Sequence, residues 1–485
     1  MFDLATIAME TARRRGASYA DARVMDVRSR DLSTKNGEVG TLNEAESLGL
    51  GIRVIAAGAW GFASTDRLTR EGVSACAARA VAIAKASALA KLKDVLLAPE
   101  APAVDTWQNP FVKDPFRIPV ERQLDLLLAA DAAMRAVKGV TLAETSMAFR
   151  RIEQFYVSTE GSRIHQVKVQ SGAGIVATSF ARDEIQKRSY PNSFGGQHTL
   201  EGYELVESFD LVRHAPRVAE EAVALHSAAQ CPEGTRTLLL ESGQLGLQIH
   251  ESVGHPIELD RVLGMEANYA GMSFLTLDKL RTLRYGSEIV NVVADARLTH
   301  GPGLGTFGYD DEGVPARCTP IITNGLFTGY LSSRETAALV GEKQSGGTVR
   351  AENWNRLPMI RMTNVSLLPG KGTSAELVES TDDGIWMETN RSWSIDDHRY
   401  HFQFSTEIAW EIKGGKRVRM LKNPSYSGIT TEFWNSCDAI CGPEEWTLWG
   451  TPNCGKGQPQ QVMGTGHGAA PARFRNVKIG AAFAK

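Results

Sequence analysis

The chain has 485 residues, of which 42% are hydrophobic and 22% charged, with 53 basic and 56 acidic side chains. At roughly 150 residues per domain, this length predicts about three folding units. The formal net charge of −3 offers no basic excess for binding nucleic acid or an anionic membrane surface. No stretch approaches the roughly 18 uncharged apolar residues of a membrane span.

The start of the sequence and the cysteine count bear on the compartment. The first sixteen residues, MFDLATIAMETARRRG, place their basic triplet after the apolar residues, which is the reverse of a secretory signal. Six cysteines in 485 residues are too few for a disulfide scaffold. We therefore expect a cytoplasmic protein with reduced thiols.

Residues 1–105 are predicted to form an N-terminal α+β unit. An apolar face and the stop signal Gly16 predict a helix over residues 1–16. Residues 20–66 are rich in β-branched side chains, with turns at Asn36-Gly37 and near Gly58, and predict antiparallel strands. An Ala/Lys/Leu pattern predicts a helix over 67–97, and the proline-rich residues 98–118 predict a linker.

Residues 106–230 are predicted to form a second α+β unit. The expected order is a helix over 119–137, strands over 139–178 and a helix over 210–229. This order repeats that of the first unit. Either the N-terminal half is a pseudo-repeat, or α+β order has recurred by chance, because no residue-level period is visible.

Residues 231–485 contain many short β-like runs separated by glycines. We expect strands over 236–241, 288–294, 404–413 and 472–479, and a helix near the start that carries a metal site. The overall prediction is an α+β chain whose C-terminal domain is predominantly antiparallel β.

The strongest chemical signal is His250-Glu251-Ser252-Val253-Gly254-His255. Histidines at i and i+5 on a regular helix are about 140° apart, too far to share a metal. Pro256 disfavours helical backbone at His255, and Gly254 tolerates a π-bulge or an unwound turn. We therefore predict a helix that deforms or ends at Gly254, bringing both imidazoles together, with Glu251 as general base toward a metal-activated water.

Two imidazoles do not hold zinc tightly, so a third protein ligand is expected, with one position left open for water. The candidates are Glu258, Asp260, Glu266 and the cysteines of the last fifty residues. Cys454 is favoured because it lies in a glycine-rich segment, where Lys456 would favour the thiolate. Cys437 and Cys441 are expected to be ordinary buried thiols.

Several motifs together resemble the TldD/PmbA family, and specifically its metal-bearing TldD-type member. They are the His250–His255 string, Cys454-Gly455-Lys456-Gly457, Gly308–Gly313 (GYDDEG), Arg361-Met362-Thr363-Asn364 and Asn423–Thr430 (NPSYSGIT). The resemblance covers nearly the whole chain. It implies a zinc peptidase whose metal is held by His250, His255 and Cys454, with Glu251 as catalytic base.

The resemblance also implies a partner and a substrate class. TldD-type subunits pair with a metal-free PmbA (TldE) paralogue, and the dimer admits only extended peptides or unfolded segments, including leader-bearing peptides and small labile proteins. A homodimer is the other arrangement we expect. The competing hypothesis is a non-catalytic peptide-binding subunit with a vestigial zinc site. Deaminase chemistry is disfavoured because its P-C-x-x-C string is missing from the sequence.

Other polar and aromatic residues carry weaker signals. Asp310, Asp311 and Glu312 are expected to form a solvated turn, with support of a ligand histidine as the alternative. His398 and His401 are three apart in a predicted strand and should point to opposite faces. His467 is uninformative, and Trp354, Trp386 and Trp393 are candidates to line a peptide groove.

Overall fold

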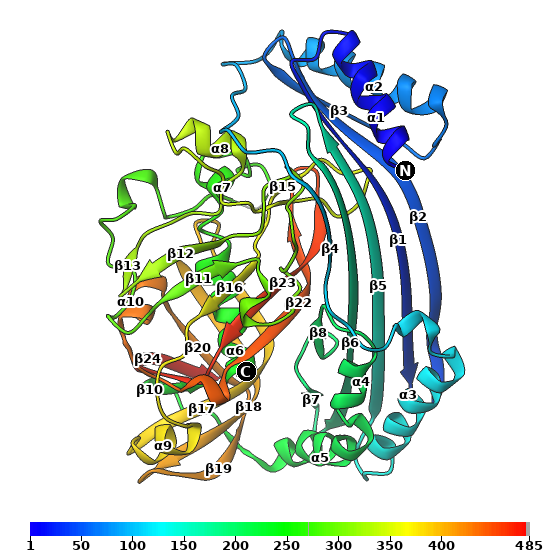
Figure 1. Ribbon diagram of the computed structural model, residues 1–485. Helices are drawn as coiled ribbons and strands as arrows, with labels where there is room; N and C mark the ends of the chain where they lie inside the picture. Colours follow the sequence, from blue (N-terminus) through cyan, green and yellow to red (C-terminus); the bar gives the residue numbers. More distant parts are fainter. Residues whose placement is uncertain (270, 482–485) are drawn as a thin grey trace.

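The computed structural model describes residues 1–269 and 271–481. The N-terminal half builds one eight-stranded sheet with the order β3-β2-β1-β5-β6-β4, to which β7 and β8 add by pairing with β6. Its strands are β1 (Tyr19–Lys35), β2 (Glu38–Ala56), β3 (Ala59–Thr65), β4 (Val104–Gln108), β5 (Leu142–Ser158), β6 (Arg163–Ala181), β7 (Glu184–Tyr190) and β8 (Gln197–Thr199). Figure 1 shows the long strands of this sheet standing beside the C-terminal domain.

The length of these strands follows from two long hairpins. β1 and β2 contain 17 and 19 residues and meet at Asn36-Gly37, where φ angles of 51° and 87° suit an Asn-Gly hairpin turn. β5 and β6 also contain 17 and 19 residues, and β1 pairs antiparallel with β5 along its length. The two predicted units therefore share one continuous sheet.

Two groups of helices pack at opposite ends of the long strands (Figure 1). They are α1 (Phe2–Arg14) and α2 (Arg70–Ser87) at one end, and α3 (Val120–Arg135), α4 (Glu204–Ser208) and α5 (Leu211–Ala224) at the other, with short 3₁₀ turns η1 (Pro115–Arg117) and η2 (Leu225–Ser227). Each group buries its own apolar cluster against the sheet. The order helix, strands, helix thus occurs twice, with three strands between α1 and α2 and four between α3 and α4, while the division at residues 105 and 230 stays a prediction.

Three N-terminal expectations differ in detail from the structure. The helix predicted over 67–97 ends at Ser87, because residues 88–97 form turns and irregular chain. The predicted linker contains β4, which pairs in parallel with β6. β7 was not anticipated, since its sequence EIQKRSY lacks an alternating apolar pattern.

The C-terminal domain contains two larger sheets and one small ribbon, and most strand pairs are antiparallel, as predicted. The first sheet holds β17 (Asp383–Ile395), β10 (Gly234–Leu240), β24 (Ala472–Ala481), β20 (Pro424–Ile429), β18 (His401–Lys413), β19 (Lys416–Lys422), β9 (Ala229–Gln230) and β21 (Cys437–Ile440). The second holds β13 (Leu326–Phe327), β12 (Cys318–Thr323), β11 (Val292–Asp295), β16 (Asn364–Leu367), β23 (Gln461–Ala469) and β22 (Thr447–Lys456). The ribbon pairs β14 (Val349–Arg350) with β15 (Met359–Ile360).

The helices of this domain are short. They are α6 (Ser242–Ile249), α7 (Leu259–Val262), α8 (Arg334–Leu339), α9 (Ser374–Glu379) and α10 (Thr430–Asn435), with a π-helical turn η3 (His250–Gly254) and 3₁₀ turns η4 (Leu277–Lys279), η5 (Leu298–His300) and η6 (Pro443–Glu445). Within residues 1–269 and 271–481, no helix combines the length and the apolar character needed to cross a membrane.

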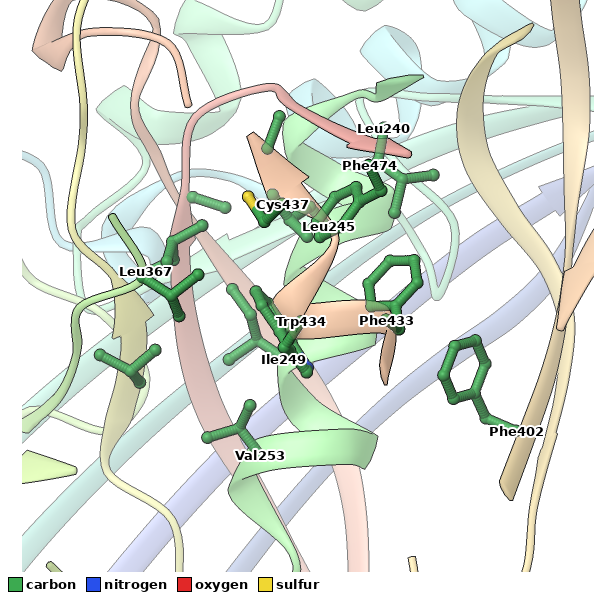
Figure 2. Packing of buried hydrophobic residues seen from close by; sticks show 14 of the residues in the cluster. Leu240, Leu245, Ile249, Val253, Leu367, Phe402, Phe433, Trp434, Cys437 and Phe474 are labelled. Carbon is green, nitrogen blue, oxygen red and sulfur yellow. The ribbon is translucent and has the colours of Figure 1, made fainter. Parts of the chain in front are cut away.

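Helix α6 is anchored in the core of the C-terminal domain. Leu245, Ile249 and Val253 follow the predicted i, i+4, i+8 spacing and are fully buried. Figure 2 shows them on one side of the helix, among aromatic side chains that include Trp434 and Phe474. The apolar stripe thus fixes the helix, and the histidines follow its last residue, His250 at the start of η3 and His255 directly after η3.

Polar side chains join the two halves of the molecule. Asp311 accepts from Arg23 Nη1 at 3.1 Å and from Gln154 Nε2 at 2.8 Å, and Glu312 accepts from Arg53 Nη1 at 3.2 Å. The expected solvated turn is therefore wrong at this position. Asp311 and Glu312 are buried between the halves, where they are counter-charges for arginines on the face of the N-terminal sheet. They do not touch the two motif histidines.

Candidate metal centre

The backbone changes from α to π geometry at the histidine motif. The N–H of His255 donates to the carbonyl of His250 at 3.1 Å, which is an i to i+5 bond within η3. The predicted deformation before Gly254 is confirmed as a π-helical turn. A Cβ on Gly254 would lie 2.1 Å from Sδ of Met362, so the close approach of that side chain requires glycine.

The three ligands named from the sequence lie together. One donor atom from each of His250, His255 and Cys454 falls within 4.8 Å of the other two, and all three side chains are buried. Cys454 Sγ is 3.9 Å from His255 Nε2. Zinc bonds of about 2.0 to 2.3 Å place tetrahedral ligand atoms about 3.5 Å apart. The donor set and its spacing therefore fit one zinc ion.

The Nδ1 atom of His255 is held by a carboxylate. It lies 3.1 Å from Glu258 Oε2, which leaves Nε2 directed at Cys454. Burial alone would raise the pKa of Glu258, but Lys456 and the His255 imidazole outweigh burial and hold that pKa well below its ordinary value. Glu258, a candidate third ligand in the sequence, is thus placed as the carboxylate that orients a ligand imidazole.

A chain of hydrogen bonds fixes the tautomer of His250. His467 Nδ1 lies 3.1 Å from the carbonyl of Val365, which can only accept, so Nδ1 carries the proton. Nε2 of His467 then accepts from Nδ1 of His250 at 2.7 Å. As a result, Nε2 of His250 keeps a free lone pair for a metal.

The protonation states suit metal binding. Burial lowers the pKa of both His250 and His255, which favours the neutral imidazoles that a metal requires. Burial alone would raise the pKa of the Cys454 thiol, but Arg361 and His255 outweigh burial and lower that pKa. Lys456 was expected to favour the thiolate of Cys454. This expectation is wrong, because the Lys456 ammonium lies between Asp260 and the carbonyl of Ile360.

Glu251 follows the first ligand on the π-helical turn and is 6% exposed. Arg399, from the connection between β17 and β18, places Nη1 3.3 Å from Glu251 Oε2. This buried carboxylate therefore follows one of the donor histidines in the chain and has a cationic neighbour on one side.

Other residues singled out from the sequence lie away from this donor set. Cys437 and Cys441 are buried thiols whose pKa burial raises, in keeping with the expectation of ordinary core cysteines. Asp260 pairs with Lys456, and Glu266 accepts from the Gly457 N–H at 3.3 Å. His398 lies in the turn before β18, and so is not in a strand.

The tryptophans predicted for a peptide groove are separated in space. Trp354 packs over β2, donating to Ser47 Oγ at 2.9 Å. Trp386 is 3% exposed, with the Arg417 guanidinium over its ring. Trp393 is exposed and contacts Phe194. Among the residues that the structure describes, these three do not share one surface.

His467 and Arg361 were missed as site residues. His467 lies on β23, which pairs with β22, the strand that carries Cys454, whereas Arg361 lies between β15 and β16 and donates to the carbonyl of Cys454. The only signal for His467 in the sequence is that it follows Cys454 by thirteen residues, a spacing that would allow the two residues to lie on the paired strands of one hairpin.

A buried donor set of two histidines and one cysteine, with a carboxylate beside it, defines a candidate mononuclear metal site of the metallopeptidase type. Profiles of the PmbA/TldA metallopeptidases match residues 20–84 (domain 1), 113–228 (central domain) and 233–480 (C-terminal domain). The chain belongs to the PmbA/TldA metallopeptidase family.

Individual relatives with metalloprotease names, and one solved structure, are similar to this chain over most of its length. A metalloprotease from Methanocaldococcus jannaschii is 28% identical over 93% of this chain and 95% of its own length. A metalloprotease TldD homolog from Buchnera aphidicola subsp. Schizaphis graminum is 26% identical over 86% of this chain and 84% of its own. The crystal structure of TldE from Thermococcus kodakarensis shares the fold, with a TM-score of 0.73 at 16% identity, over 99% of this chain and 100% of that one.

Proposed function

We propose that this protein is a zinc-dependent peptidase. The observation that carries the proposal is the convergence of His250, His255 and Cys454, with donor atoms within 4.8 Å of one another and with Glu251 next to His250 in the chain. Three protein ligands leave one position open, as in catalytic zinc sites, whereas purely structural sites are closed by four.

The residues have distinct roles in this proposal. Zinc, when bound, supplies a Lewis acid and lowers the pKa of water. Glu251 accepts the proton of the attacking water and delivers it to the leaving amine. Arg399 holds the Glu251 carboxylate by its 3.3 Å contact. Glu258 and His467 keep the two imidazoles in the tautomer that offers Nε2.

We further propose that the substrates are extended or unfolded peptides, including leader peptides and small labile proteins. The donor set is buried, so a folded protein surface cannot reach it. We propose a heterodimer with a metal-free PmbA/TldE-like paralogue, with a homodimer as the alternative. The fold shared with TldE supports a pairing of similar chains. All six cysteines are free thiols, which supports a reducing cytoplasmic location.

Glu251→Gln tests the assignment of the base. We expect this variant to bind zinc as the wild type does and to lose cleavage of an unstructured peptide by at least about a hundredfold, because only the proton acceptor is removed. Zinc content and peptide hydrolysis are measured on the same preparation. Unchanged cleavage would remove Glu251 from the mechanism.

Cys454→Ser tests the ligand set in the same assays, with Cys437→Ser as the matched control. The first should release zinc and the second should retain it. The alternative of a non-catalytic peptide-binding subunit predicts that wild-type protein with a full complement of zinc binds peptide and cleaves none, in the presence or absence of a paralogue.

A further inference from the structure

A cavity lies between the inner face of the N-terminal sheet and the C-terminal domain. β5 and β6 contribute Arg150 and Lys168, and the opposite wall contributes Arg350, with Met463 and Gly464 of β23. Three cationic side chains therefore face a space at the junction of the two halves.

Lys168 has no carboxylate partner among the described residues. Asp311, the acid whose charge acts most strongly on Lys168, is already bonded to Arg23, to Gln154 and to the N–H of Ala351 at 2.6 Å. Burial lowers the pKa of Lys168 to about 8. Asp311 opposes this effect, and the cations Arg350, Arg150 and Arg23 add to it.

Arg350 is also without a carboxylate partner in the part of the chain described. Its Nη1 donates to the carbonyls of Leu304 and Gly464 at 3.3 and 3.0 Å, and its Nη2 donates to the carbonyl of Met362. Its Nε is buried with no hydrogen-bond acceptor. Burial, together with Arg361, lowers the pKa of this guanidinium to about 9.

The acids that line the cavity do not neutralise these cations. Asp310 accepts from the N–H groups of Glu312, Val314 and Val349, and burial beside Glu312 raises its pKa well above the ordinary value. Glu352 accepts from the N–H of Val462 at 3.1 Å. Asp311 is the counter-charge of Arg23. Asp310 is held toward its neutral form and Asp311 is paired with Arg23 outside the lining, so Glu352 is the one lining acid left against Arg150, Lys168 and Arg350, and the cavity keeps an excess of positive charge.

The cavity adjoins the metal centre. Met463 pairs with Cys454 across the β22–β23 ladder. Neighbouring strands lie about 4.8 Å apart, so this wall of the cavity is one strand from the backbone of Cys454. Arg350 also donates to the carbonyl of Met362, whose sulfur packs on Gly254 of the π-helical turn.

We propose that this cavity binds a carboxylate of the peptide substrate, with the Lys168 ammonium as its ion-pair partner and the free Nε–H of Arg350 as a second donor. A carboxylate matches one unpaired cation, and its single charge is repelled less by the carboxylates of Asp311 and Glu352 than the double charge of a phosphate would be. The inference rests on the proposed peptidase function and makes Lys168 a specificity-determining residue.

The carboxylate has two sources, the peptide C-terminus and an Asp or Glu side chain. One unstructured parent peptide is therefore made in three forms: free C-terminus with neutral side chains, amidated C-terminus with neutral side chains, and amidated C-terminus with one Gln replaced by Glu at each position in turn. In the wild type we expect kcat/KM for one carboxylate-bearing form to exceed that of the neutral form by about tenfold or more.

Lys168→Met should bring this ratio close to one while zinc content stays full. Lys413→Met is the matched control, because Lys413 pairs with Asp383 at 2.7 Å and both side chains are exposed, so its ratio should equal that of the wild type. A wild-type ratio of one, or a ratio that survives in Lys168→Met, would overturn the proposal.

Binding separates this inference from the peptidase proposal. The Kd values of the same peptides are measured with Glu251→Gln, with and without Lys168→Met, because this comparison requires no turnover. A charge preference in binding that depends on Lys168 supports the cavity even if the wild type cleaves no peptide. Equal Kd values for the neutral and anionic peptides would contradict the proposal that the cavity binds a carboxylate, even if the wild type cleaves peptides efficiently.

The preference should also depend on pH. The groups that face the Lys168 ammonium are Arg23, Arg150, Arg350, Asp310, Asp311 and Glu352. Because the pKa of Lys168 is about 8, its charge is present at pH 6.5 and largely lost at pH 9.5. In Glu251→Gln, the Kd of the neutral peptide divided by the Kd of the anionic peptide should therefore be lower at pH 9.5 than at pH 6.5. A ratio independent of pH would contradict the role of Lys168.

Discussion

The hydrogen bonds made by the Nδ1 atoms of His250 and His255, two of the proposed ligands, decide which nitrogen each imidazole offers to a metal. Val365 fixes the proton on His467 Nδ1, and His467 in turn fixes the proton on His250 Nδ1. Glu258 does the same for His255 from the opposite side. The two imidazoles are therefore oriented by different means, one by a second histidine and one by a carboxylate.

Replacing His467 with alanine should weaken zinc binding. The Nδ1–H of His250 would lose its acceptor, so the tautomer and the ring orientation would no longer be fixed, and we expect a tenfold to hundredfold loss of zinc affinity. Competition with a chromophoric chelator measures this loss. His401→Ala, at an exposed histidine outside the site, is the control and should bind zinc like the wild type. Equal affinity of both variants would show that His467 does not position His250.

At this scale the sequence was informative only where the chemistry is local. The motif spacing pointed to His250, Glu251 and His255, and both the glycine-rich segment and the resemblance favoured Cys454. The position of His467 depends on the pairing of β23 with β22 and β16, and that of Arg361 on its bond to the Cys454 carbonyl, and no local pattern records either. Lys456 was misassigned for the same reason, since its partners Asp260 and Ile360 come from distant segments.

The π-helical turn is the element that brings the donor atoms of His250 and His255 together. The i, i+5 spacing would place the two histidines about 140° apart on an α-helix, and one i to i+5 bond corrects this angle. This deformation followed from Gly254, Pro256 and the i, i+5 spacing alone. By contrast, β4 and β7 were missed because their strands hold few alternating apolar residues.

Gly254→Ala should damage the π-helical turn. The new Cβ would meet Met362 Sδ at 2.1 Å in a fully buried setting, so we expect a loss of about 1 to 3 kcal/mol in stability and reduced zinc occupancy. Gly246→Ala, on helix α6, is the control, because its Cβ would find ordinary contacts at 3.6 Å. Chemical denaturation and zinc content are measured for both. Similar stabilities for the two variants would argue against a steric requirement at Gly254.

The whole molecule depends on buried polar contacts between its halves. The N-terminal sheet presents Arg23, Arg53 and Gln154 to the acids at 311 and 312, where an apolar interface would have been the simpler expectation. The sequence predicted the α+β class and the order of elements. It could not predict that both N-terminal units share one sheet, since that depends on the pairing of β1 with β5.

Asp311→Ala should destabilise the folded protein strongly. Arg23 Nη1 would lose its carboxylate in a buried setting, which costs about 3 to 5 kcal/mol. Glu46→Gln is the control, because Glu46 is exposed and its pair with Arg28 contributes less than about 1 kcal/mol. Thermal unfolding followed by circular dichroism provides the comparison. A melting temperature of Asp311→Ala equal to that of the control would show that the contact is not stabilising.

The position of β23 and β24 in the sheets has a consequence for biosynthesis. β24 lies inside its sheet, between β10 and β20, and β23 supplies His467 and the ladder partner of Cys454. The histidine motif leaves the ribosome some two hundred residues before Cys454 does. The proposed ligand set is therefore complete only after β22 has been synthesised, and a nascent chain arrested before β22 would lack the third donor for zinc.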